Sequence, residues 1–154
     1  GARSRHRGIE ADMDIWLKAD WYLGANVSYG NHEYDFDATG RGESFVAGND
    51  IRTAPRWLGG AEIRYQPVDG WQAGLRVQHV GAYFLDSGNE HRYSGHTIVN
   101  LRSVFPLSER LTLTLKINNL LDKRYADRAD YAGRDYRYLP GRGREGFAEL
   151  RFSP

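Results

Sequence analysis

The sequence contains no cysteine, so it can form neither a disulfide framework nor a thiolate metal site. No stretch approaches the roughly 20 consecutive apolar residues that a membrane-spanning helix needs. The formal net charge is only +1, with 21 Lys and Arg against 20 Asp and Glu. A broad positive field that would favour nucleic acid as a partner is therefore absent. These absences exclude a disulfide scaffold, a helical membrane protein and a strongly basic nucleic-acid binder.

Motifs of catalysis and metal binding are also missing. The sequence nowhere reads Gly-x-Ser-x-Gly, the turn that presents a nucleophilic serine. Its five histidines are scattered along the chain and have no helical ligand spacing: His6, His32, His79, His91 and His96. We therefore predict no enzyme activity, no cofactor and no metal site.

What the chain does contain is strict alternation of apolar and polar residues. In the segment 111–118, Leu and Ile occupy every odd position, and Thr, Lys and Asn occupy every even position. Successive side chains of a strand point to opposite faces, so this segment predicts a strand with one apolar and one wet face.

Seven segments show this alternation, and the connections between them are alternately short and long. Tight turns on one side and long loops on the other are typical of the wall of an outer-membrane β-barrel. The predicted fold is therefore all-β, an antiparallel up-and-down transmembrane barrel wall. We expect strands over 8–17, 21–34, 51–65, 71–84, 95–105, 111–121 and 143–152, with long polar loops over 35–50, 85–93 and 122–142.

One choice of faces removes charge from the lipid side of every predicted strand. A charge at the membrane midplane costs roughly 2–4 kcal/mol. The residues that this choice places inside the barrel include Arg56, Arg64, Arg76 and Arg102, which we predict to line the lumen. His79 is the one histidine left outside. Aromatic residues gather near both ends of the strands and suggest two interfacial girdles: Trp16, Trp21, Tyr65, Trp71 and Phe105 beside the short turns, and Tyr29, Trp57, Tyr83 and Phe84 towards the long loops.

Two other classes remain open at this point. A soluble β-sandwich binding module would show the same alternation, with the charged residues facing solvent. A membrane-embedded barrel enzyme such as a lipase would need a base on the lipid face, for which His79 is the candidate. The first predicted strand begins almost at once, with no element before it to cover its edge, so we expect a piece of a longer chain.

The last third of the sequence resembles the TonB-dependent outer-membrane receptors. Residues 116–126, with Asn119, Leu120, Asp122 and Tyr125, resemble the segment Asn-Leu-Phe-Asp-Lys-x-Tyr near the end of these proteins. Pro140 and Gly141 stand where the family has Pro-Gly-x-Pro-Arg, although Gly143 replaces the second proline. The segment 147–152, ending in Phe152, resembles their final strand, here followed by Ser153 and Pro154.

The resemblance implies a barrel of about 22 strands, of which residues 1–154 would be the C-terminal portion, without the plug domain. It implies a place in the bacterial outer membrane, in contact with lipid, and assembly by the barrel assembly machinery. It also implies uptake of a ferric siderophore or related ligand, energised by TonB through the missing plug region. We expect the family motif to shape the barrel rather than to touch ligand.

The loop 125–138 is the best candidate for ligand contact. Tyr131, Arg134, Tyr136 and Arg137 crowd together there. Arginine offers planar paired donors to anions, and tyrosine offers a flat ring with a hydroxyl. This mixture would suit an anionic ferric chelate at the outer mouth. A solvated loop that packs on its neighbours is the alternative interpretation.

Overall fold

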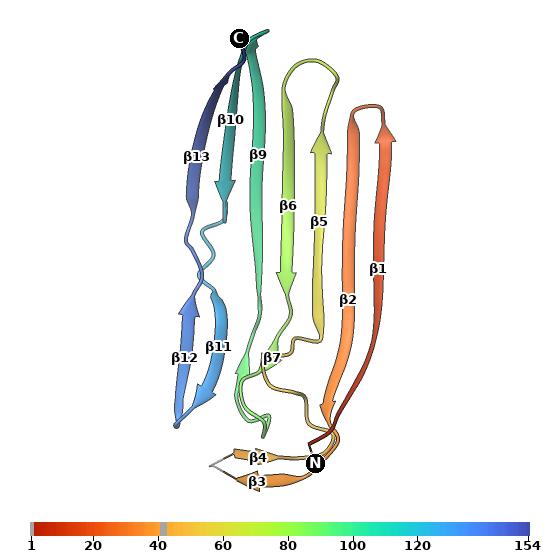
Figure 1. The fold of residues 1–154 in the computed structure, drawn as a ribbon, viewed down its shortest axis with the longest axis vertical. Coiled ribbons are helices and arrows are strands. Elements are labelled where there is room, and N and C mark those ends of the chain that lie inside the picture. The colour runs from red at the N-terminus through yellow and green to blue at the C-terminus, as the bar shows by residue number, and fades with distance from the viewer. Residues whose placement is uncertain (1, 41–42) are drawn as a thin grey trace.

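The computed structural model describes residues 2–40 and 43–154, and they form one large antiparallel sheet with three small hairpins beside it (Figure 1). The sheet has seven strands in the order β1-β2-β5-β6-β9-β10-β13. Its strands are β1 (Ser4–Lys18), β2 (Trp21–Tyr34), β5 (Trp57–Tyr65), β6 (Gln72–Val80), β9 (His96–Ser108), β10 (Leu111–Asn118) and β13 (Glu145–Phe152). Every strand of this sheet pairs with its neighbour in the chain, as the alternation of short and long connections predicted.

The three long connections carry the hairpins, and they gather at one end of the sheet, opposite the tight turns (Figure 1). These pairs are β3 (Ala38–Gly40) with β4 (Glu43–Phe45), β7 (Tyr83–Phe84) with β8 (Arg92–Tyr93), and β11 (Ala126–Ala132) with β12 (Asp135–Pro140). We call the residues of the three long connections, 35–56, 81–95 and 119–144, the cap. The sequence predicted these segments as loops; the hairpins within them were missed.

The strand register confirms the two-faced pattern. Directly opposed residues share a face. One row crosses six strands with aliphatic side chains alone: Ile15, Leu23, Ile63, Leu75, Leu101 and Ile117. The next row on the other face contains Tyr22, Arg64, Gly74, Arg102 and Lys116. The apolar face is therefore continuous across strands, and the charges lie on its reverse.

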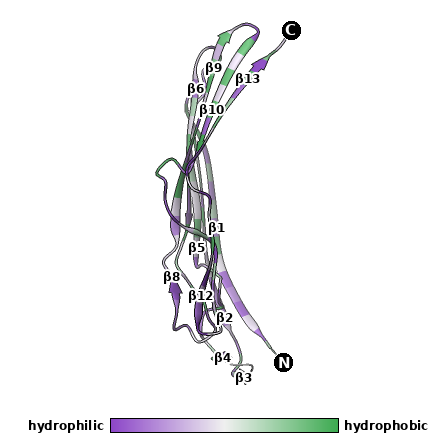
Figure 2. Ribbon diagram, turned by 90° about the vertical axis from the view of Figure 1, so that its left-hand side faces the viewer, coloured by the Kyte–Doolittle hydropathy of each residue, from purple (hydrophilic) through white to green (hydrophobic). Residues whose placement is uncertain are grey.

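Neither face of the sheet is covered by a second layer in the described part of the chain, and edge-on it is a single curved sheet (Figure 2). Large apolar side chains lie open on it, with Ile9 73% and Leu150 63% exposed. A soluble sandwich would bury this face between two sheets. The interpretation as a soluble sandwich is therefore wrong. The exposed apolar face requires an apolar environment such as lipid. The described residues include no helix that is long and apolar enough to cross a membrane.

Aromatic side chains mark both borders of the apolar face. Near the tight turns, ring contacts run from Trp21 through Tyr65 and Trp71 to Phe105, with centroids 5.0, 6.0 and 6.2 Å apart. Eight residues further along β2, the Tyr29 ring packs at a tilt against Trp57, with centroids 4.7 Å apart. Eight steps of about 3.4 Å on a strand tilted by about 40° span roughly 20 Å, close to the apolar band of such barrels.

Two of the predicted girdle residues lie elsewhere, and a third, Phe84, lies in β7 of the cap and not on the sheet. Trp16 packs edge-on against Tyr22 at 5.5 Å, and their direct opposition places both rings on the charged face. Tyr83 is only 8% exposed and belongs to the buried core of the cap. The girdle prediction is therefore wrong for these residues. His79 does lie on the apolar face, where its Nδ1 and the Thr97 hydroxyl are 2.9 Å apart, one row inside Tyr29 and Trp57.

Several predicted strand ends also need correction. The strands expected over 8–17 and 95–105 are longer than predicted, since β1 begins at Ser4 and β9 ends at Ser108. Three others are shorter. The strand expected over 51–65 begins only at Trp57, because Thr53 has a positive φ of 59° and Pro55 has no N–H to donate. The strand expected over 71–84 ends at Val80, where Gly95 has φ +78° and comes too close to the Val80 carbonyl for any side chain. The strand expected over 111–121 ends at Asn118, because Asn119 is left-handed, with φ 49°. In each case a turn conformation replaces the extended backbone.

Candidate ligand-binding site

The β11–β12 hairpin contains all four residues that the sequence selected for ligand contact. Ala132 pairs with Asp135 across a two-residue turn, in which Gly133 and Arg134 have φ of 63° and 72°. Positive φ at both central positions is the turn that matches the twist of paired strands. Arg134 is consequently an exposed residue at the very tip of the hairpin.

Strand alternation separates the other three residues. Tyr131 and Tyr136 are directly opposed, with ring centroids 5.2 Å apart, and share one face of the hairpin. Arg137 is opposed to Asp130, so it lies on the other face, with its Nε 2.5 Å from the carboxylate. The expectation that all four side chains crowd into one group is therefore wrong.

The tyrosine face continues into an aromatic cluster that the sequence analysis missed. The His91 ring stacks on Tyr131 with centroids 3.5 Å apart and an interplanar angle of 11°. On the other side, Tyr138 stacks parallel to Tyr136 at 6.1 Å. Tyr136 and Tyr138 remain about half exposed. The result is a row of four rings, of which Tyr136 and Tyr138 are the most exposed, on a hairpin whose tip carries Arg134. Only hairpin pairing around Gly133 could have predicted it.

The hairpin is fixed to the rest of the cap by a small buried core. Leu85 and Ala129 are fully buried and pack with Tyr83 and Ala126. The Tyr83 hydroxyl accepts a hydrogen bond from the Ala129 amide at 3.2 Å. Burial raises the pKa of the Tyr83 phenol above its ordinary value of 10.0. This core holds the row of rings in place relative to the barrel strands.

A second attachment joins the first long connection to the second. The Asn89 side chain donates to the Asp50 carbonyl at 2.9 Å and accepts from the Asp50 amide at 2.7 Å. Asn49 donates to the Ser87 carbonyl at 3.2 Å. The three long connections therefore form one connected cap rather than independent loops.

One cluster in the cap has the donor atoms of a metal site. Asp86, Glu90 and His91 each offer a ligand atom within 4.8 Å of the others. Asp86 is already engaged, since its carboxylate accepts from both the Glu90 and His91 amides and lies 2.7 Å from His91 Nδ1. These bonds account for the cluster as a turn that positions the His91 ring against Tyr131.

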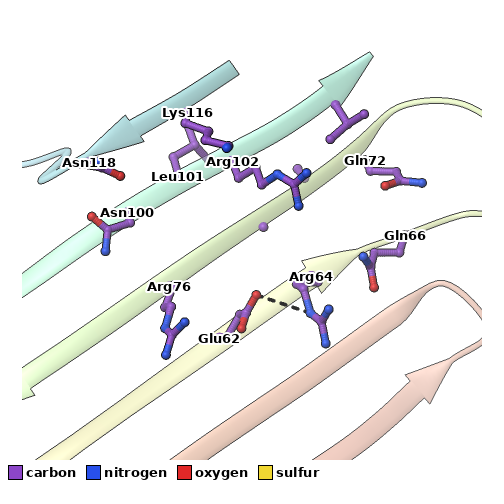
Figure 3. Close-up of a pocket in the computed structure, with 13 residues that line it drawn as sticks. Glu62, Arg64, Gln66, Gln72, Arg76, Asn100, Leu101, Arg102, Lys116 and Asn118 are labelled. Carbon is purple, nitrogen blue, oxygen red and sulfur yellow. Dashed lines mark ion pairs between the residues drawn. The ribbon is translucent and has the colours of Figure 1, made fainter. Parts of the chain in front are cut away.

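The charged face of the sheet has a hollow of about 290 Å³ between β5 and β10 (Figure 3). Its basic residues come from four strands: Arg64, Arg76, Arg102 and Lys116. Its other polar lining residues are four amides and one carboxylate: Gln66, Gln72, Asn100, Asn118 and Glu62. Among the residues that the structure describes, Arg76, Arg102 and Lys116 have no ion-pair partner, and Arg64 lies 3.4 Å from Glu62 and over the Tyr22 ring.

Arg56 is placed differently from the other three predicted lumen arginines. It precedes β5, outside the sheet, and its guanidinium lies 2.6 Å from the Asp50 carboxylate of the cap. It is not among the residues around the hollow. Its position follows from the late start of β5, and its ion pair with Asp50 lies within the first long connection of the cap.

The residues of the family motif make structural contacts. Asn119 is 2% exposed, and its side chain bonds to the backbone of Lys123 and Arg142. Asp122 accepts from the Arg144 amide at 2.9 Å, and Leu120 donates its amide to the Val99 carbonyl at 2.7 Å. These bonds close the third long connection where it leaves β10 and returns to β13.

The remaining motif residues extend the same closure. The Tyr125 ring lies over Gly141, where a Cβ would come within 2.2 Å of the ring, and Gly141 donates its amide to the Tyr125 carbonyl at 2.9 Å. Pro140 ends β12 opposite Ala126, and Phe152 is paired with Leu111 at the end of β13. The Tyr125 ring leaves no room for a side chain at position 141, which explains why this turn uses glycine.

Comparison with known proteins identifies the family to which the chain belongs. Residues 1–120 match the family model described as TonB dependent receptor-like, beta-barrel. The metal-pseudopaline receptor CntO of Pseudomonas aeruginosa is 30% identical over 92 residues, which are 56% of this chain and 13% of that protein.

Two solved structures have the same fold. The siderophore receptor PiuA from Acinetobacter baumannii superimposes with a TM-score of 0.81 at 18% identity, over 98% of this chain and 22% of that one. The ferric yersiniabactin uptake receptor FyuA from Yersinia pestis gives 0.80 at 20% identity, over 98% and 24%. This chain thus spans less than a quarter of the length of these relatives. It belongs to the TonB-dependent receptor family, and its sheet is a wall of the family's outer-membrane β-barrel.

Proposed function

We propose that residues 1–154 are the C-terminal barrel portion of a receptor that imports an iron–siderophore complex, or a similar metal chelate, across the outer membrane. The relatives are described as receptors for siderophores, for ferric yersiniabactin and for metal-pseudopaline. The single observation that carries the proposal is the fixed row of rings on the β11–β12 hairpin, with an arginine at its tip.

Ligand would bind on the tyrosine face of the hairpin. Tyr131 and Tyr136 offer flat rings and hydroxyls, which suit the aromatic or amide planes of a chelator. Arg134 would pair with an anionic group of the chelate, because its guanidinium donates in a planar fork. Arg137 is already paired with Asp130, so it would support the hairpin rather than contact ligand.

Transport would require no covalent chemistry. Energy would come from TonB, acting through a plug region that lies outside these residues, and the polar inner face with Arg64, Arg76 and Arg102 would line the path. The wall would contact outer-membrane lipid through its apolar face, and the barrel assembly machinery would insert it. We propose no enzyme activity, because the relatives are described as receptors.

The test measures both the binding and the uptake of radiolabelled metal chelates by cells that carry the full-length receptor. We expect Tyr136→Ala and Arg134→Gln to weaken chelate binding at least tenfold, while protein level in the outer membrane stays unchanged. Arg110→Gln is the matched control, because this residue lies in a tight turn at the opposite end of the sheet. Wild-type affinity in both hairpin variants would refute the site.

A further inference from the structure

The charged face of the sheet carries a pair of histidines that no step of the proposed import uses. His6 of β1 and His32 of β2 are directly opposed in the register, with ring centroids 5.1 Å apart. Their Nδ1 atoms lie 2.9 Å from each other. They lie beyond the row of Tyr29 and Trp57, on the part of the hairpin that leads to the cap.

The backbone beneath the pair is shaped for these rings. The next opposed pair on the same face is Gly8 with Gly30. A Cβ on Gly30 would lie 2.5 Å from His32 Nε2, and one on Gly8 would lie 2.7 Å from the Tyr29 carbonyl oxygen. Any larger residue at position 30 would displace the His32 ring. Gly30 therefore leaves the space that the His32 ring occupies, and Gly8 allows the close approach of the β1 backbone to β2 at this point.

The second nitrogen of His6 also has a partner. Ser4 Oγ lies 2.9 Å from His6 Nε2, so it can accept the proton of that nitrogen. Histidine ligands of metals usually donate their other ring N–H to an oxygen, which leaves the first nitrogen free to bind the ion. Ser4 thus supplies the outer contact that a metal-binding imidazole requires.

The nitrogen separation discriminates between metals. With metal–nitrogen distances of about 2.0–2.1 Å, two ligands at 90° stand about 2.9 Å apart, and two tetrahedral ligands stand about 3.3 Å apart. The observed 2.9 Å fits the 90° angle. That angle occurs in square-planar, tetragonal and octahedral sites, and imidazole ligands in the first two favour Cu²⁺ and Ni²⁺, whereas Zn²⁺ favours the tetrahedron. Without an ion, the same 2.9 Å is the length of a hydrogen bond between the two nitrogens.

We propose that His6 and His32 form a two-histidine site for Cu²⁺ or Ni²⁺ on the inner face of the barrel wall, with water in the remaining positions. The ion would replace the contact between the two Nδ1 atoms and would join β1 to β2 near the cap. The site is independent of the import proposal, because it binds the bare ion and uses no residue of the β11–β12 hairpin.

The experiment titrates Cu²⁺ alone into the full-length protein in detergent micelles, in glycine buffer, with the double variant His6→Ala/His32→Ala for comparison. We expect the double variant to bind one Cu²⁺ fewer per molecule, and each single variant to bind that ion at least tenfold more weakly. The electron paramagnetic resonance spectrum of wild type should show two bound nitrogens. His79→Ala, which changes the histidine of the opposite face, should leave both measurements unchanged.

Two further experiments test whether the ion is held by this pair of histidines. Gly30→Ala retains both imidazoles but displaces the His32 ring, so it should also lose the ion. Bound Cu²⁺ should protect His6 and His32 of the unaltered protein from modification by diethyl pyrocarbonate. The proposal is wrong if the double variant keeps the stoichiometry and spectrum of wild type, or if Zn²⁺ binds to the pair more tightly than Cu²⁺.

Discussion

The side-chain amide of Asn119 donates to the backbone carbonyl of Arg142 at 3.0 Å, although 23 positions separate the two residues in the chain. The same amide donates to the Lys123 carbonyl at 2.9 Å, and its oxygen accepts from the Lys123 amide at 2.8 Å. One buried side chain therefore joins both ends of the third long connection, at the point where the wall meets the cap.

We expect Asn119→Ala to open this connection. The substitution leaves buried carbonyl and amide groups without partners, which costs about 2–4 kcal/mol. Hydrogen exchange of the full-length protein should show faster exchange over residues 120–144, with the rest of the barrel unchanged. Asn118→Ala is the control, because it removes a side-chain amide at the neighbouring, exposed position. Hydrogen exchange of this variant should match that of wild type.

Gly141→Ala should disturb the same region by a different cause. The new methyl group would lie 2.2 Å from the Tyr125 ring, so the ring must leave its place, at a cost of about 1–3 kcal/mol. Gly146→Ala is the control, because its Cβ meets nothing within 4 Å. Thermal unfolding measured by circular dichroism should separate the two; equal melting temperatures would contradict the contact.

The two faces of β6 predict different losses of stability when arginine is introduced at neighbouring positions. Val77 lies in a lipid-facing row with Ala61 and Val99, and Gln78 lies on the charged face. Val77→Arg places a charge near the membrane midplane and should cost about 2–4 kcal/mol. Gln78→Arg should cost less than half as much. Folding into lipid vesicles under a urea gradient measures both, and similar losses would contradict the assignment of faces.

Alkaline pH should open the cap through Tyr83. Burial raises the pKa of this phenol in the folded cap, so the unfolded chain, with its ordinary pKa near 10.0, loses the proton first. The contribution of Tyr83 to stability is therefore complete below pH 10 and is lost as the pH rises above it. In an ultraviolet titration of tyrosinate at 295 nm, the phenol that is missing from Tyr83→Phe should ionise at higher pH than the exposed tyrosines.

The alternation of side chains predicted the wall because lipid imposes a single rule on every strand. A residue such as Leu75 must be apolar, and its neighbour Arg76 must face away from the membrane. That rule ends where the chain leaves the membrane. The cap is held by Leu85, by the Tyr83 hydroxyl and by the Asp50–Asn89 bonds, none of which has a period in the sequence.

The candidate site could be predicted only in part for the same reason. The composition of the loop 125–138 identified Tyr131 and Tyr136, but only the turn at Gly133 determines which residues share a face. His91 was missed because its contact with Tyr131 joins two separate connections. Family resemblance identified Asn119 and Gly141 without their contacts, which the backbone of the closed connection supplies.

The wall and the cap are stabilised by different surroundings. Leu85 and Ala129 are buried by protein alone, whereas Leu150 and Phe152 are exposed on the sheet and would be covered by the acyl chains of lipid. Exchanging one detergent for another, or thinning the bilayer, should therefore alter the melting of the sheet and leave the packing around Leu85 as it was. The sheet therefore depends on the lipid or detergent around it, whereas the cap depends on contacts between its own residues.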